Sequence, residues 1–182
     1  MEKIIRIDKK EYTAKATALS LIIYRASFGR DGLQDIINML PGSAQDSAAV
    51  DGVIILQLLW SYIKTADKNA PPFELWLNNQ FAMASETVAT VLYQVVELSF
   101  SNMQTKIKSN QVSTSGTREP LTTELLLCHA ADRGLSLIDF EHMTVGMVLD
   151  YLTLCQNLDI EARNKKPEEP TRQATQADID AF

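Results

Sequence analysis

The chain contains few cysteines, glycines and prolines, and it has no long uninterrupted apolar run. Two cysteines in 182 residues provide no disulfide framework and are typical of a reducing compartment. Seven glycines and six prolines exclude collagen-like and low-complexity chains. Because Gln57 and Ser61 interrupt the longest apolar run, no segment approaches the roughly 20 residues that span a bilayer. The charged N-terminal stretch lacks the apolar core of a signal peptide, so we expect a soluble intracellular protein without membrane contact.

Positive charge is also scarce. Seventeen Lys and Arg residues face 23 Asp and Glu residues, giving a net charge of −6. A face that binds nucleic acid non-specifically needs the opposite balance, so we expect no nucleic-acid partner. With 46% hydrophobic residues, the length suits one globular domain with room for a small satellite.

Groups that carry catalysis or bind metals are sparse and poorly spaced. His129 follows Cys128 and His142 follows Glu141, but neither spacing matches a zinc-binding pattern. Carboxylates are scattered along polar helix stripes instead of forming pairs suited to acid–base chemistry. We therefore predict a protein that is not an enzyme and that has no cofactor, catalytic residue or metal site.

The residue patterns predict a mainly α fold that opens with a short β-hairpin. Residues 4–8 and 11–16 form the expected strands around a Lys9-Lys10 turn. Thr17 is expected to begin a helix that ends at Phe28-Gly29, and Asp31 caps a second helix over residues 33–40. The apolar face expected for the first of these helices consists of Leu19, Ile22, Ile23 and Ala26.

The segment over residues 52–77 is the expected centre of the fold. Residues 53–64 are apolar on nearly every side, with Gln57, Ser61 and Lys64 forming a narrow polar stripe. Pro71-Pro72 then ends the helical pattern before a short amphipathic turn. Three aromatic residues in this segment are core residues or, alternatively, an exposed partner-binding patch. These candidate residues are Trp60, Phe73 and Trp76.

The C-terminal half contains a second helical region. Residues 82–107 are expected to form the longest amphipathic helix, with Leu92, Val95 and Phe100 among its inward residues. The polar residues 108–120 then indicate a linker. Helices are expected over 124–133, 136–143 and 144–157, and Leu154 is expected to face inward in the last of them. Ser136, with Asp139 three residues later, resembles a capping box at the start of the second. The predicted division is 1–107 for the N-terminal domain, 108–120 for the linker, 121–158 for a small helical unit, and 159–182 for a flexible tail.

The small helical unit has an alternative interpretation as a helix-turn-helix. Ala130, Gly134 and Phe140 have the required spacing. The recognition helix would be residues 136–143, which offer Asp139 and Glu141 to the DNA phosphates and no Arg, Lys, Asn or Gln to a base. This composition favours a plain helical hairpin over a DNA-binding regulator.

The terminal stretch ATQADIDAF combines a polar tether with apolar side chains. Thr175 can cap a helical turn in which Ile179 and Phe182 share one side. Such anchors suit docking into a partner's groove, whereas the alternative is a frayed terminus.

Two stretches resemble a known family. LSLIIYRASFGRDGLQDI (residues 19–36) and ILQLLWSYIKTADKNAPPFELWL (residues 55–77) are similar to tail assembly chaperones of long non-contractile-tailed phages and prophages of Gram-positive hosts. The opening hairpin IIRIDKKEYTAKAT also resembles the usual start of that family. The shared features are Tyr24-Arg25, Phe28-Gly29, Asp31, Trp60, Thr65-Ala66-Asp67, Pro71-Pro72-Phe73 and Trp76-Leu77.

The resemblance implies a non-enzymatic role in the host cytoplasm. Such chaperones coat the helical tape measure protein, keep it soluble until tail tube subunits polymerise around it, and are absent from the mature virion. The gene often also encodes a shorter form, and residues 121–158 with the terminal stretch resemble the frameshift extension of the longer form. In contrast to the paired lysines often encoded near that join, Lys106 and Lys108 are separated. The expected partners are therefore the tape measure protein, the tail tube protein, the shorter form and further copies of this chain. The alternative is a structural or adaptor protein retained in the particle.

Overall fold

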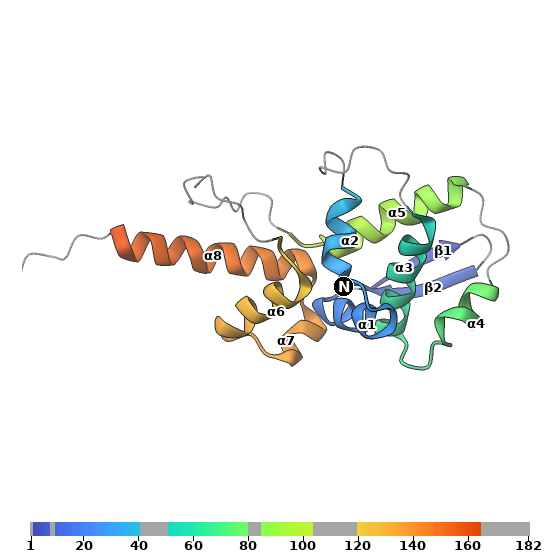
Figure 1. Ribbon diagram of the computed structural model, residues 1–182, viewed down its shortest axis with the longest axis horizontal. Coiled ribbons are helices and arrows are strands. Elements are labelled where there is room, and N and C mark those ends of the chain that lie inside the picture. The colour runs from blue at the N-terminus through green and yellow to red at the C-terminus, as the bar shows by residue number, and fades with distance from the viewer. Residues whose placement is uncertain (1, 8–9, 41–50, 80–84, 104–119, 165–182) are drawn as a thin grey trace, which may run out of the picture.

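The computed structural model describes residues 2–7, 10–40, 51–79, 85–103 and 120–164, with the side chains of 85–88 excepted. Its described part is mainly helical and opens with a two-stranded antiparallel sheet, as predicted. Figure 1 shows the hairpin at one end of the molecule and the last helix extending away at the other end. In chain order the elements are β1 (Glu2–Ile7), β2 (Lys10–Lys15), α1 (Ala18–Phe28), α2 (Gly32–Asn38), α3 (Gly52–Ala66), α4 (Phe73–Asn78), α5 (Ser85–Ser99), α6 (Thr123–Asp132), α7 (Leu137–His142) and α8 (Val145–Asn164).

The hairpin buries one of its two faces. Strands β1 and β2 pair from Glu2 opposite Lys15 to Ile7 opposite Lys10. Ile5, Ile7 and Ala14 are buried beneath the helices that cross the sheet, whereas the alternating outer face carries charged residues. The period-2 pattern in the sequence therefore corresponds to a half-buried sheet.

Helix α1 begins and ends as predicted, but it buries a different face. Thr17 occupies the N-cap position and Gly29 follows the last turn with a φ of 66°. Leu21 and Tyr24 are fully buried, whereas Ala26 of the predicted apolar face is exposed and Ile22 is only partly buried. The Tyr24 hydroxyl donates a 2.7 Å hydrogen bond to Asp35, so its polar group is satisfied inside the protein. Burial, followed by this hydrogen bond, raises the pKa of Tyr24.

Helix α3 forms the centre of the fold, as the sequence predicts. It is apolar and buried over most of its length, and Asp51 caps it by accepting a 2.9 Å hydrogen bond from the Val53 amide. The predicted polar stripe is wrong at Ser61, which is fully buried. Its hydroxyl donates to the Gln57 carbonyl at 2.9 Å, which allows a small polar residue inside the core.

Helix α5 is not the longest helix, because the described chain leaves it at Ser99 and turns through Asn102, whose φ is 61°. Its 15 residues are exceeded by the 20 residues of α8, which continues beyond the predicted end. The most buried apolar positions of α5 are Val91, Val95 and Leu98, a face rotated from the predicted one. The part of the prediction beyond residue 103 lies outside the described residues.

Candidate partner-binding surface

The three aromatic candidates belong to the core side of the molecule. Trp60 and Trp76 are 5% and 2% exposed, and Phe73 is partly buried between them. The Phe28 ring lies 5.6 Å from that of Trp60 and 5.1 Å from that of Phe73, both edge to face. The indole of Trp60 donates a 2.9 Å hydrogen bond to the Pro71 carbonyl, which fixes the proline turn against α3. In this conformation the two tryptophans hold the turn in place and offer little surface to a partner.

The other two candidates, Ile179 and Phe182, lie outside the described residues. Their role as apolar anchors on a polar tether therefore stays a prediction.

A groove between α1 and α6 is an apolar candidate surface. It has a volume of about 380 Å³, and its lining comes from one face of each helix. The lining residues are Ile22, Arg25, Ala26, Thr123, Glu124 and Leu127. Ile22 and Ala26 belong to the face of α1 that the sequence marks as apolar and that the fold leaves incompletely covered. Sequence reasoning missed the groove because its second wall comes from a segment about 100 positions later.

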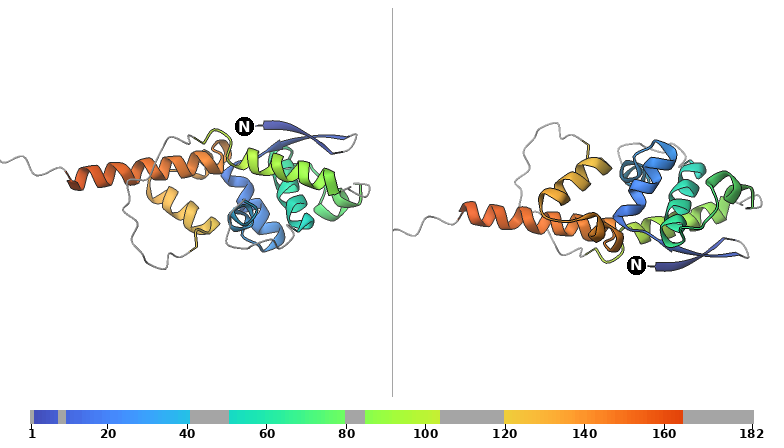
Figure 2. Two further views of the ribbon diagram at one scale, coloured as in Figure 1. Left: turned by 90° about the horizontal axis from the view of Figure 1, so that it is seen from above. Right: turned by 90° about the horizontal axis from the view of Figure 1, so that it is seen from below.

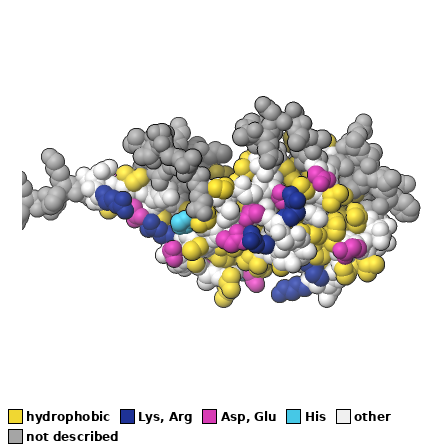
Figure 3. Space-filling view, viewed as in Figure 1, with side chains coloured by type: hydrophobic (Ala, Val, Ile, Leu, Met, Phe, Trp, Pro, Cys, Tyr) yellow, Lys and Arg dark blue, Asp and Glu magenta, His cyan; other side chains and the backbone are white. Residues whose placement is uncertain are grey.

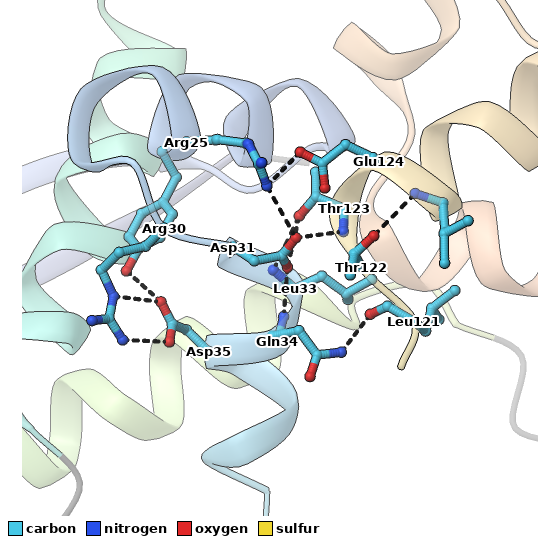
Figure 4. Close-up of polar contacts among 12 residues, drawn as sticks. Arg25, Arg30, Asp31, Leu33, Gln34, Asp35, Leu121, Thr122, Thr123 and Glu124 are labelled. Carbon is cyan, nitrogen blue, oxygen red and sulfur yellow. Dashed lines mark hydrogen bonds and ion pairs between the residues drawn. The ribbon is translucent and has the colours of Figure 1, made fainter. Parts of the chain in front are cut away.

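One carboxylate lies at the end of this groove and joins the two helical regions. Figure 4 shows Asp31 between the N-termini of α2 and α6. Its Oδ1 accepts a 2.9 Å hydrogen bond from the Gln34 amide, and its Oδ2 accepts a 2.8 Å hydrogen bond from the Thr123 amide. Arg25 lies 3.6 Å from the same carboxylate and forms an ion pair with Glu124. Asp31 therefore serves as the predicted cap of α2 and also binds the first turn of α6.

Further hydrogen bonds hold the C-terminal helices against the N-terminal ones. The Gln34 side chain donates to the Leu121 carbonyl, again between the two regions (Figure 4). The Ala18 amide donates to the Met143 carbonyl at 2.9 Å, and the Thr144 hydroxyl donates to the Ser101 carbonyl at 2.6 Å. The described part of the C-terminal unit is thus packed against α1, α2 and the end of α5.

Helices α6 and α7 form a hairpin whose spaced small and apolar residues point into the protein. Ala130 and Phe140 are buried, as they would be in a plain helical hairpin and in a helix-turn-helix alike, so it is the acidic composition of α7 that disfavours DNA binding. The predicted capping box is present, because Ser136 and Asp139 exchange backbone and side-chain hydrogen bonds. The Ser136 hydroxyl, and then its amide, lowers the pKa of the Asp139 carboxyl by hydrogen bonding to the ionised form.

Two apolar surfaces remain exposed on the C-terminal helices. Leu137 and Ile138, in the first turn of α7, are 67% and 70% exposed. On α8 the prediction that Leu154 faces inward is wrong, since it is 46% exposed and Leu158 is 64% exposed. Leu152, Gln156 and Asp159 lie toward α6, so Leu154 and Leu158 face the opposite side of α8.

A second hollow lies between α6 and α8 and is more polar. It encloses about 290 Å³ and includes His129 and Arg133 in its lining. Arg133 forms an ion pair with Asp159, and its carbonyl accepts a 2.7 Å hydrogen bond from the Tyr151 hydroxyl. These interactions link α6 to α8 beside the hollow.

The described surface carries both apolar and charged side chains. Figure 3 shows hydrophobic side chains mixed with charges of both signs across one face of the molecule. Among the residues that the structure describes, no three His, Cys, Asp or Glu side chains are grouped closely enough to hold a metal ion. In the same part of the chain, no helix is long and apolar enough to cross a membrane. Comparison with protein-family models, curated proteins and solved structures found no match to this chain.

Proposed function

We propose that this protein is a phage tail assembly chaperone that binds the tape measure protein and keeps it soluble until the tail tube forms around it. The proposal starts from the sequence resemblance. The residues that carry the resemblance pack in the core or form turns. This supports a fold shared with that family as the reason for the resemblance. Gly29 provides the left-handed turn after α1, and Asp31 caps α2. Trp60 and the Pro71 carbonyl fix the proline turn.

The groove between α1 and α6 is the observation that carries the functional part of the proposal. A tape measure protein is expected to be a long helix with exposed apolar stripes. Ile22, Ala26 and Leu127 form an apolar hollow between two helices, a geometry suited to side chains of a third helix. Binding there would cover apolar surface on both proteins and so reduce aggregation of the tape measure.

The exposed residues of α7 and α8 are the proposed contact for a second partner, the tail tube protein. The groove is lined by α1 and α6, whereas Leu154 and Leu158 are exposed on α8, so both partners could bind at the same time. Ile179 and Phe182 would add a second attachment point on a tether. The protein would act without catalysis in the host cytoplasm, alongside the shorter form, and would be absent from the mature virion.

Co-expression with the tape measure protein of the same phage or prophage tests the first half of the proposal. The tape measure should remain in the soluble fraction only when this chain is present, and the two should co-elute from an affinity column. Equal insolubility with and without this chain would remove the basis for a chaperone role. Mass spectrometry of purified virions distinguishes the structural or adaptor alternative, since an assembly chaperone should be missing from them.

A pair of substitutions on α1 tests the groove itself. Ala26 is exposed and lines the groove, whereas its exposed neighbour Ser27 does not line it. Ala26→Arg should fill the hollow and weaken co-elution of the tape measure, while Ser27→Arg adds the same charge to the same helix and should not. If the two variants bind equally well, the tape measure does not use this groove. Retained solubilisation would then separate failure of the site from failure of the function.

A further inference from the structure

The two outer edges of the β-hairpin differ in their surroundings. The edge of β2 lies beside α4, where the Lys10 ammonium donates a 2.6 Å hydrogen bond to the Asn79 carbonyl and the Tyr12 ring lies 5.9 Å from Trp76. In the part of the chain that the structure describes, no backbone hydrogen bond joins β1 to any element except β2. In both views of Figure 2 the hairpin lies on the outside of the helical body. Strand β1 therefore presents unpaired amide and carbonyl groups to the exterior.

Proteins usually protect such an edge with prolines, bulges or charged side chains, and β1 carries only the last of these, with Lys3 on its inner face and Glu2 and Arg6 on its outer face. It contains no proline or glycine, and all six of its residues are paired in register with β2, without a bulge. Its outer face carries Glu2, Ile4 and Arg6, of which Ile4 is 59% exposed. The Arg6 guanidinium lies 2.7 Å from the Glu11 carboxylate on β2, and because this ion pair is exposed, Arg6 would be shared between Glu11 and Glu2 of a second copy. Charges of one sign would repel a second copy of the same strand. Here the two charges are opposite, and they lie on either side of an exposed isoleucine.

This order of residues complements itself in one antiparallel register. Pairing that keeps the buried and outer faces aligned must place residues of like parity opposite each other. With Ile4 opposite the second copy's Ile4, Glu2 lies opposite Arg6 on both sides of the axis. A register centred on Lys3 would place two lysines opposite each other, and one centred on Ile5 would place Ile4 opposite Arg6. Opposite charges and paired β-branched residues are both favourable across strands, so the outer face prefers the register centred on Ile4, which places Lys3 opposite Ile5 on the inner face.

An exposed aromatic residue lies beside the same edge. The Lys3 ammonium lies 2.7 Å from the Glu97 carboxylate, which places this flank of α5 next to β1. Tyr93 lies one helical turn before Glu97 and is 76% exposed. Because a two-fold axis perpendicular to the sheet keeps the helices of both copies on one side, Tyr93 would contribute to the same interface.

We propose that β1 pairs with β1 of a second copy of this chain around a two-fold axis at Ile4. The two hairpins would then form one four-stranded antiparallel sheet with the strand order β2-β1-β1-β2, flanked by both α5 helices. The interface is isologous and closes after two copies, so it produces a dimer and not a fibre. It uses neither the groove nor α8, and it does not depend on the proposed tape measure interaction.

Two matched substitutions on the outer face test the dimer. Ile4 lies at the proposed axis, and Thr13 lies directly opposite it on β2, one strand further from the second copy. Ile4→Lys places two like charges across the axis and should raise the dimer dissociation constant by about tenfold or more. Thr13→Lys adds the same side chain to the same sheet face and should leave dissociation near the wild-type value. Light scattering over a range of concentrations measures both, with a tag at the C-terminus and circular dichroism to confirm folding.

Disulfide trapping tests the register. In a background carrying Cys128→Ser and Cys155→Ser, Ile4→Cys should form a covalent dimer with oxidised glutathione, because opposite residues of antiparallel strands have Cα atoms about 4.5–5.5 Å apart. The Thr13→Cys variant in the same background should stay monomeric on a non-reducing gel.

A wild-type protein that is monomeric at every concentration would overturn the proposal, as would a dimer indifferent to Ile4→Lys. Loss of the dimer in both lysine variants would indicate stacking of sheet faces and would overturn edge pairing. If the protein were monomeric and its β1 edge instead bound a strand of another protein in an Ile4-dependent way, the proposed pairing with a second copy would be wrong.

Discussion

Replacing Asp31 with alanine removes a carboxylate that serves two helices at once. The loss of an N-cap on α2 costs about 1 kcal/mol of unfolding free energy. The Thr123 amide at the start of α6 would lose its 2.8 Å acceptor, and Thr123 is only 2% exposed. A buried donor left without an acceptor costs about 1–3 kcal/mol. We therefore expect Asp31→Ala to lower the free energy of unfolding by roughly 2–4 kcal/mol, a large part of the roughly 5–15 kcal/mol of a typical domain.

Urea unfolding followed by circular dichroism measures this loss, and the melting temperature should fall by roughly 5–15 °C for a chain of this length. Two local probes show where the loss occurs. Trp60 and Trp76 are the only tryptophans in the chain and report on the aromatic cluster. Hydrogen exchange over residues 123–132 reports on α6. Since Asp31 joins α6 to α2, exchange in α6 should accelerate more than the tryptophan signal changes.

The control is Asp51→Ala, which removes a cap from α3 alone. Among the described residues, the Asp51 carboxylate accepts only the Val53 amide, and Asp51 is exposed, so the expected cost is about 1 kcal/mol. The free energy of unfolding of Asp31→Asn should lie between those of the wild type and Asp31→Ala. The asparagine side chain keeps one oxygen as an acceptor, but its NH₂ group would face the other backbone N–H. Equal costs for Asp31→Ala and Asp51→Ala would show that the contact with α6 adds no stability, and the reasoning would then be refuted.

Three further substitutions test contacts elsewhere. Gly146→Ala should lower the urea midpoint, because the added Cβ would lie 3.1 Å from the Phe100 backbone and the roughly 1–3 kcal/mol of overpacking exceeds the gain of about 1 kcal/mol in helix propensity. Tyr62→Phe removes the 2.6 Å hydrogen bond between the buried Tyr62 and Ser99 hydroxyls and should cost about 1 kcal/mol in the same assay. Because the folded pKa of Asp139 is lowered from its ordinary value of 3.8, its stabilising contribution is present above that pH and is lost as the pH falls through the folded pKa. Asp139→Asn should therefore be less stable than the wild type at pH 7 and should converge with it in acid; a pH-independent difference would contradict this assignment.

Local signals in the sequence predicted most of the element ends. Gly29 is in the left-handed conformation that its position after α1 suggested, and Asp31 caps the next helix. The capping box of Ser136 and Asp139 is formed as expected. Each of these interactions spans at most four residues, so the sequence of one segment contains all the information that it requires.

Predictions failed where distant segments decide which face is buried. On α1 the apolar residues alone suggested a face through Ile22 and Ala26, but Tyr24 is buried, and its hydroxyl donates a hydrogen bond to the Asp35 carboxylate. The partner of Asp31 on α6 lies 92 positions away. Sequence patterns assign a polar residue to the surface unless its hydrogen-bond partner is known. The periodicity of a single segment cannot identify a partner in another segment.

The docking of α6 against α2 also affects how the two proposed partner contacts can be separated. Deleting residues 109–182 would remove Thr123 from Asp31 and Met143 from the Ala18 amide, so both groups would lose their partners in the N-terminal region. Loss of tail tube binding in such a truncation could then follow from disturbed α1 and α2 instead of a missing contact surface. A substitution at Leu158, which is 64% exposed on α8, leaves those hydrogen bonds intact. The division of roles between the groove and α8 is therefore tested on exposed faces of the whole chain, because the described helical regions support each other's ends.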